Sequence, residues 1–344
     1  MSETAGGIGP LNWPALVAEA IRRRKAEKLT QREHAALASV SIPTMIAFDR
    51  GERTLSLAKA TDILRVVGLV VEVSNEGAQE IFVRDAFARW RQLTAALPKN
   101  SPGRFSHGWY RIDYALEGDI KEVELHKFPD VLRRAVVQHT GWNMFGLPRR
   151  PELQAHEVDG VIECWLAPGD KADFDRPFYD AAHCDFWRAA PSGRMFLIRG
   201  YQEDAQETFP PGTIFDTTLP IWRLGEALLH ASKLAALIAR DSKKTTVRLR
   251  ALYTGLSGRD LRAWASPTSV DFFGGGRSRT DEALIENEAP AAAIEPELGR
   301  FVYPLVASLF ERFGVTGVST DFVDSVLQQM RQNRFGNDAE ERKG

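Results

Sequence analysis

Residues 29–69 have the sequence LTQREHAALASVSIPTMIAFDRGERTLSLAKATDILRVVGL, and the helix signals in this stretch decide the fold of the first part of the chain. Thr30 is followed three residues later by Glu33, which is the pattern of a capping box, where two side chains satisfy backbone N–H groups at a helix start. The pattern predicts a short helix that begins after Thr30 and ends at Ala38.

A second helix signal follows almost immediately. Ser41 is a good N-cap residue, and Pro43 suits a first helical turn. We expect this helix to end at Asp49, because Gly51 favours a stop. Only residues 39–41 separate the two helices, which is too few for them to lie antiparallel side by side. The helices must therefore cross steeply, which is the geometry of a helix-turn-helix.

Two further helices flank this pair. Residues 14–28 show apolar side chains at helical spacing and a basic C-terminal end, which suits the helix dipole. That end contains Arg22, Arg23, Arg24, Lys25 and Lys28. Leu55 or Ser56 begins a fourth helix, which Gly68 ends. The run at 69–73 is rich in β-branched residues and predicts a short strand, which could pair with its copy in a second chain.

The stretch 29–69 resembles the Cro/C1-type helix-turn-helix of phage repressors and their relatives, the XRE family. Its marks here are Gln31 at a helix start, Ala35 at the tight helix contact, Val40 and Ser41 in the turn, and the close Phe48-Asp49-Arg50-Gly51. The later SLAKATDILRVVGL matches the family's fourth and fifth elements. The resemblance implies an all-α, lambda-repressor-like domain over residues 11–74 that binds double-stranded DNA.

The resemblance also implies which residues face the DNA. The N–H groups at the start of the first helix of the pair should meet a phosphate, because a helix N-terminus carries partial positive charge. Residues just after the second helix of the pair should contact the opposite side of the groove. Exposed residues on that helix should face the base edges. The expected contacts are Gln31, Arg32, Ser41, Ile42, Pro43, Thr44, Ile46, Ala47, Arg50, Arg53 and Thr54.

The side chains expected to face the bases depart from the family pattern. Family members commonly carry Gln, Arg, Lys or Asn there, whereas this helix carries Ile42, Pro43, Ile46 and Ala47. Hydrogen-bonded readout would then be sparse, and thymine methyl groups and DNA shape would carry more of the specificity. We therefore expect modest intrinsic specificity.

Two polar residues of the stretch have structural explanations. His34 stands where the family usually has a buried aliphatic residue, so we expect a packed histidine rather than a ligand or a pH switch. Asp49 can pair with a basic residue of the helix at 14–28, such as Arg24 or Lys25.

The net charge hides an uneven distribution. The 344 residues include 44 Lys and Arg against 46 Asp and Glu, a net charge of −2, which excludes a polybasic nucleic-acid coat. Residues 1–71 hold 10 basic side chains against 7 acidic ones, and residues 72–344 hold 34 against 39. A basic head, residues 1–71, thus precedes an acidic body, residues 72–344. The acidic body repels DNA and would confine the DNA contact to the head.

Cysteine content and hydropathy restrict the cellular compartment in which the protein is expected. Cys164 and Cys184 cannot make a disulfide framework and fit a reducing environment. Residues 1–10 lack the basic and apolar regions of a secretory signal, and the apolar run 66–71 is far shorter than the roughly 20 residues of a membrane helix. We therefore expect a cytoplasmic protein with no membrane contact.

Residues 75–104 are expected to form a helical connector and a linker. An apolar stripe runs through 80–97, and it would pack on its own domain or, because the head offers little surface, on a second chain. The stripe consists of Phe82, Ala86, Phe87, Trp90, Leu93 and Leu97. PKNSPGR at 98–104 is rich in turn residues and is the clearest linker.

Residues 105–335 are predicted to form one mixed α/β (α+β) domain for sensing or dimerisation, because strand-like and helix-like runs are interspersed. The strand-like runs are 161–166, 195–198 and 245–252, and the helix-like runs are 130–139, 220–239 and 298–313. Aromatic residues are dense in three expected loops, 141–146, 174–180 and 184–189. The polar end at 336–344 is expected to be disordered.

One acidic cluster in the body invites an enzyme interpretation. Metal-dependent nucleases hold Mg²⁺ with carboxylates beside a lysine, and the residues here are Asp119, Glu122, Glu124 and Lys127. Their spacing is wrong for the nuclease pattern, and an amphipathic surface strand yields the same residue types. We therefore favour a surface strand and expect no catalytic residue.

Other constellations are weaker still. His156, Cys164, His183 and Cys184 lack the spacing of a zinc site, so we expect packing and no metal. GGGRSR at 274–279 lacks the end of a phosphate-binding loop and is expected to be a mobile loop.

Tryptophans and arginines of the body could line a pocket for an anionic or planar ligand, although tryptophan density more often marks a core. They are Trp142, Trp165, Trp187, Trp222 and Trp264, with Arg149, Arg150, Arg188 and Arg199.

These observations predict a sequence-specific transcriptional regulator, a repressor, that binds DNA as a homodimer. Its C-terminal domain would sense a small molecule or protein or would oligomerise, without a cofactor. The alternatives are a nuclease-like effector enzyme or a toxin–antitoxin or defence component whose head autoregulates it or targets it to DNA, and a body that is only an interaction scaffold.

Overall fold

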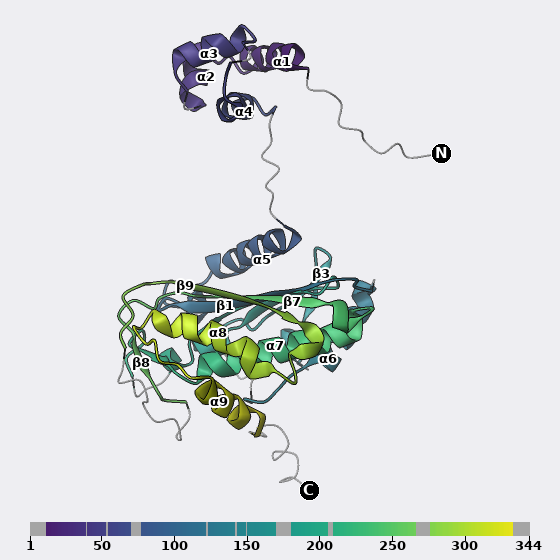
Figure 1. The fold of residues 1–344 in the computed structure, drawn as a ribbon, viewed down its shortest axis with the longest axis vertical. Helices are drawn as coiled ribbons and strands as arrows, with labels where there is room; N and C mark the ends of the chain where they lie inside the picture. The colour runs from purple at the N-terminus through teal and green to yellow at the C-terminus, as the bar shows by residue number, and fades with distance from the viewer. Residues whose placement is uncertain are drawn as a thin grey trace. The chain divides into compact units, whose positions relative to one another are not determined.

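The computed structural model describes residues 12–38, 40–52, 54–69, 77–121, 123–141, 143–148, 150–169, 180–205, 209–265 and 276–332. The chain divides into two compact units, residues 1–76 and 77–344. The first unit is helical in its described part, and the second contains a large antiparallel sheet with helices (Figure 1).

Four helices make up the described part of the first unit. They are α1 (Trp13–Ala26), α2 (Gln31–Leu37), α3 (Ile42–Asp49) and α4 (Leu57–Val66). Local capping explains their starts: the Thr30–Glu33 capping box is present, and the Ser41 hydroxyl accepts a hydrogen bond from the Thr44 N–H at 3.3 Å. Ser56 caps α4 in the same way. All four predicted helices are confirmed, whereas the strand predicted at 69–73 lies outside the described residues from 70 onward.

The second unit is built on a seven-stranded sheet in the order β2-β3-β4-β5-β1-β7-β9, and every pairing in it is antiparallel. Its strands are β1 (Trp109–Glu117), β2 (His156–Val158), β3 (Val161–Trp165), β4 (Phe186–Ala190), β5 (Arg194–Gly200), β7 (Thr246–Tyr253) and β9 (Ala283–Pro290). Two short strands, β6 (Ile214–Asp216) and β8 (Asp260–Arg262), form a separate parallel pair.

Helices cover both faces of this sheet. One face packs against α6 (Phe128–Ala135), α7 (Leu219–Ile238), α8 (Leu298–Glu311) and α9 (Thr320–Gln332) (Figure 1). Helix α7 is buried along most of its length, and β7 shows why: its alternate residues, from Val247 to Tyr253, point into this layer. The opposite face carries α5 (Ala78–Ala95).

The packing of α5 shows which surface its apolar stripe contacts. Val83, Ala86 and Trp90 join a buried cluster with Phe186 and Phe196 of the sheet. The stripe therefore packs against the sheet of the second unit itself. Within the described part of the chain, no helix is both long and apolar enough to cross a membrane.

Most predicted elements of the body are confirmed, and two are corrected. The strand-like runs correspond to β3, β5 and β7, and the helix-like runs to α6, α7 and α8. The helix expected over 130–139 ends at Ala135, because the Val136 backbone leaves the helical conformation and the Glu226 carboxylate accepts the N–H groups of His139 and Thr140. The loop expected at 184–189 is mostly strand β4, which pairs with β3 and β5.

Candidate nucleic-acid interface and interior pocket

A buried ion pair fixes the orientation of α3 in the first unit. The guanidinium group of Arg24, on α1, donates to both carboxylate oxygens of Asp49 at 2.9 and 2.6 Å. The Gln31 side-chain amide, at the start of α2, also donates to Asp49. One carboxylate thus joins three helices, above a core that includes Met45 and Phe48. Of the two partners expected for Asp49, the structure selects Arg24.

The residues expected to contact DNA lie at the surface wherever the structure describes them. Gln31, Arg32, Ser41, Ile42, Pro43, Arg50 and Thr54 are exposed, and Thr44, Ile46 and Ala47 are half-buried. Arg53 lies outside the described residues. The opposite side of α3 faces the core through Met45 and Phe48. Helix α3 therefore has one buried side and one accessible side.

Not every basic residue of the head is available to a phosphate. Arg22 and Arg23 both donate hydrogen bonds to Glu19. These bonds lower the pKa of Glu19 to about 2, and the bond from Arg22 has the larger effect. Arg24 is committed to Asp49, and the Gln31 amide is engaged there too. Among the described residues of the expected contact set, the exposed positive charges are those of Arg32 and Arg50, and the Arg50 guanidinium group lies 3.9 Å from the Glu52 carboxylate.

The accessible start of α3 is apolar. The Ile42 side chain is 45% exposed, and Leu37, at the end of α2, is 61% exposed. Exposure of large aliphatic side chains to water is unfavourable, and their burial against a methyl-bearing surface is favourable. The Ser41 and Thr44 hydroxyl groups, which bond to each other at 2.8 Å, are the polar groups beside them.

His34 is a packed histidine, as expected. It is fully buried, and its Nε2 atom lies 2.9 Å from the Ile63 carbonyl oxygen. This contact ties α2 to α4, which gives His34 a structural role.

The structure does not assemble the enzyme-like constellations. Glu124 pairs with Lys127 on an exposed turn, and Glu122 lies outside the described residues. Cys164 and Cys184 belong to separate buried clusters on the two sides of the sheet. Burial raises the pKa of both thiols, that of Cys164 to about 12, so neither is a nucleophile in this environment. Within the described ranges, no three His, Cys, Asp or Glu side chains are grouped to hold a metal ion.

Two of the four arginines predicted to line a pocket form buried ion pairs. Arg188 pairs with Glu163 at 3.4 Å and Arg199 with Asp185 at 3.1 Å, and all four side chains are buried. Arg149 and Trp142 lie outside the described residues. Trp187 and Trp222 are buried in the main core.

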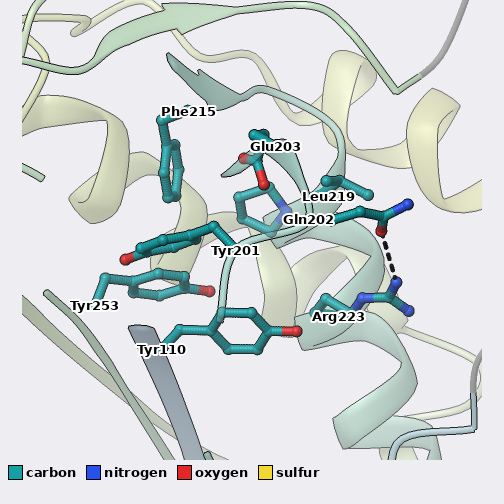
Figure 2. Close-up of a pocket in the computed structure, with 9 residues that line it drawn as sticks. Tyr110, Tyr201, Gln202, Glu203, Phe215, Leu219, Arg223 and Tyr253 are labelled. Atoms are coloured by element: carbon teal, nitrogen blue, oxygen red, sulfur yellow. Dashed lines mark hydrogen bonds between the residues drawn. The ribbon is translucent and has the colours of Figure 1, made fainter. Parts of the chain in front are cut away.

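An interior pocket does exist, at the end of the sheet where α7 begins (Figure 2). It is lined by Tyr110, Tyr201, Gln202, Glu203, Phe215, Leu219, Pro220, Arg223 and Tyr253. Tyr110 and Tyr253 are register partners on β1 and β7, and their rings stack at 5.9 Å. Figure 2 shows the hydroxyl groups of these two tyrosines on the side where Arg223 lies, whereas the Tyr201 hydroxyl points away.

A buried carboxylate, that of Glu203, lines this pocket, and a second, that of Asp216, belongs to a neighbouring hydrogen-bond network. Asp216 accepts four backbone N–H groups, from Thr218 and Leu219 at the start of α7 and from Trp264 and Ala265. Glu203 accepts the Asp216 N–H at 2.8 Å. Burial, followed by repulsion from Asp216, raises the pKa of Glu203 to about 7.

Sequence reasoning missed this pocket, although one signal for it was present. In WYRIDYALE, residues 109–117, apolar and polar side chains alternate, which predicts a strand with Tyr110 on its inward face. No local pattern relates Tyr110 to Glu203 or Tyr253, because they meet only when the sheet forms. In comparisons with known proteins, no family model, no curated protein and no solved structure matches this chain.

Proposed function

We propose that the first unit binds double-stranded DNA through α2 and α3, and that the chain is a sequence-specific transcriptional regulator whose second unit senses a ligand or oligomerises. The observation that carries this proposal is the accessible side of α3. That helix is held by the buried Arg24–Asp49 pair, and its first residues, Ser41 to Pro43, stay exposed. A major groove about 12 Å wide admits a helix presented in this way.

Charge and shape support the same reading. Arg32 and Arg50 are exposed near the ends of the α2–α3 pair, where phosphate contacts would set the register of the helix on the duplex. The apolar residues between them suit thymine methyl groups. The short connection between the two helices, residues 38–41, is consistent with a helix-turn-helix.

We infer in addition that the regulator acts as a homodimer. One small helical unit buries too little surface for tight specific binding. A second unit on a half-site about one helical turn away would make the second contact effectively intramolecular.

The test is selection of duplex DNA from a random pool by the full-length chain, followed by titration of the enriched site. We expect an enriched repeat of two half-sites, and Ile42→Glu should abolish its retention by placing a negative charge beside the phosphates. Ile81→Glu is the matched control, because Ile81 is an exposed isoleucine of the second unit. Failure to enrich any sequence, or equal binding by Ile42→Glu, would refute the proposal.

A further inference from the structure

The tyrosine-lined pocket at the start of α7 holds an unmatched polar group. The Tyr253 residue is 2% exposed, and its hydroxyl has no hydrogen-bond partner among the described residues. Leaving a buried hydroxyl group without a hydrogen-bond partner is unfavourable, so such a group marks a place where a partner belongs. Tyr253 lines the cavity, and its hydroxyl group is directed into it (Figure 2).

The charges around the cavity are also unbalanced. Arg223 is matched by Glu226 at 3.0 Å, and Arg259 by Asp204 at 2.6 Å. Glu203 is buried beside these pairs, and its carboxylate accepts hydrogen bonds from the Asp216 N–H and from its own backbone. Among the described side chains, no lysine, arginine or histidine forms an ion pair with Glu203. When the Glu203 carboxyl group is ionised, the charge that it lacks is therefore positive.

The surroundings disfavour an anion. An anion would normally take the N–H groups at the start of α7, but the Asp216 carboxylate already accepts those of Thr218 and Leu219. An anion drawn to Arg223 would also face Glu203 across the same small space. A cation would lie opposite the Glu203 carboxylate and beside tyrosines, whose rings and hydroxyl oxygens both attract positive charge. Arg223 also lines the cavity, but its charge is matched by Glu226.

Size restricts the cation further. The cavity offers about 20 Å³ to the centres of water-sized atoms, which is space for about one small heavy atom. Among the described lining residues, Gln202 alone is half-buried, so the cavity opens to solvent next to Gln202. An ammonium group fits this space, and a short tail would extend past Gln202.

We propose that the pocket bounded by Glu203, Tyr253 and Tyr110 binds a small primary ammonium group, either the ammonium ion or the head of a short alkylamine. Its N–H groups would donate to the Glu203 carboxylate and to the Tyr253 hydroxyl oxygen. This proposal concerns the second unit and does not depend on DNA binding by the first.

The test uses the full-length chain without DNA and measures thermal stability and calorimetric binding with methylammonium chloride. Potassium chloride, tetramethylammonium chloride and sodium acetate at equal ionic strength are the comparison salts. We expect methylammonium alone to raise the midpoint of the unfolding transition of the second unit in a concentration-dependent way. An equal effect of potassium or acetate would overturn the proposal, as would no effect of methylammonium.

Two variants separate the ammonium site from general effects. Glu203→Gln keeps the shape and removes the charge, and we expect at least a tenfold loss of methylammonium affinity. Tyr253→Phe removes an oxygen that has no partner in the free protein, so it should fold normally and lose affinity about threefold. Glu297→Gln, at an exposed carboxylate, is the control. Unchanged affinity in both pocket variants would refute the assignment, whatever the outcome of the DNA experiments.

Discussion

Arg24 and Asp49 form a bidentate ion pair between α1 and the last turn of α3, and their side chains are only 9% and 12% exposed. The paired geometry defines the angle as well as the distance between the two helices, because the planar guanidinium group meets both carboxylate oxygens. The pair thus links the packing of the first unit to the direction in which α3 is presented.

We expect Arg24→Met to destabilise the first unit by about 3 kcal/mol, because it leaves the Asp49 carboxylate buried without its cation. Hydrogen exchange of peptides from α1 to α4 in the full-length chain measures this directly. Arg22→Met should leave exchange unchanged, because its pair with Glu19 is exposed. Equal protection in both variants would show that the buried pair does not hold α3.

The double variant Arg32→Ala, Arg50→Ala should weaken DNA binding to all sequences and flatten its dependence on salt. Each lost phosphate contact removes about 0.9 from the slope of log K against log salt. Arg65→Ala removes the same kind of charge from α4 and should change little. A gel-shift titration at several salt concentrations compares the three proteins, and an unchanged slope in the double variant would place the phosphates elsewhere.

Replacing thymine by uracil in the selected site should weaken binding at the positions that face Ile42 and Ile46. Each lost methyl contact should cost about fourfold in affinity, from about 0.8 kcal/mol per buried carbon. Competition titrations with singly substituted duplexes map these positions. If no thymine position is sensitive, the apolar side of α3 does not read methyl groups.

The buried Glu203 should make the stability of the second unit depend on pH. Its pKa is raised from 4.5 to about 7, so the folded state prefers the protonated carboxyl more than the unfolded chain does. This contribution is full below pH 4.5 and is lost as the pH rises to about 7. The neighbouring ionisable groups are Asp204, Asp216, Arg223, Arg259, Tyr110, Tyr201 and Tyr253.

Glu203→Gln removes that contribution. Its unfolding midpoint relative to the wild-type chain should therefore rise between pH 5 and pH 8, by an amount equivalent to at most about 3 kcal/mol. Thermal unfolding of both proteins at the two pH values provides the measurement. A difference that stays constant with pH would mean that Glu203 is ionised throughout this range.

Neither cysteine should react with an aromatic disulfide reagent in the native protein. Cys164 and Cys184 are buried in separate clusters, and burial raises the pKa of each thiol. Thiol titration should therefore give no rapid reaction until denaturant is added, and then two thiols per chain. Rapid native labelling of either residue would show that its cluster opens.

The sequence alone determined the helices of the first unit, because their start signals act over three residues. The Thr30–Glu33 capping box and the Ser41–Thr44 hydrogen bond are both contacts of this kind, and a local pattern specifies them completely. The longer runs of α7, β5 and β7 were likewise readable from their periodicity.

Only the tertiary structure decided which of these elements meet. Sequence left Asp49 with two possible partners and the stripe on α5 with two possible surfaces, and packing selected Arg24 and the unit's own sheet. The pocket joins Tyr110, Glu203 and Tyr253, which are separated by up to 143 positions. Contacts at such separations depend on strand order and register, and these follow from the burial of the whole apolar surface rather than from any local pattern.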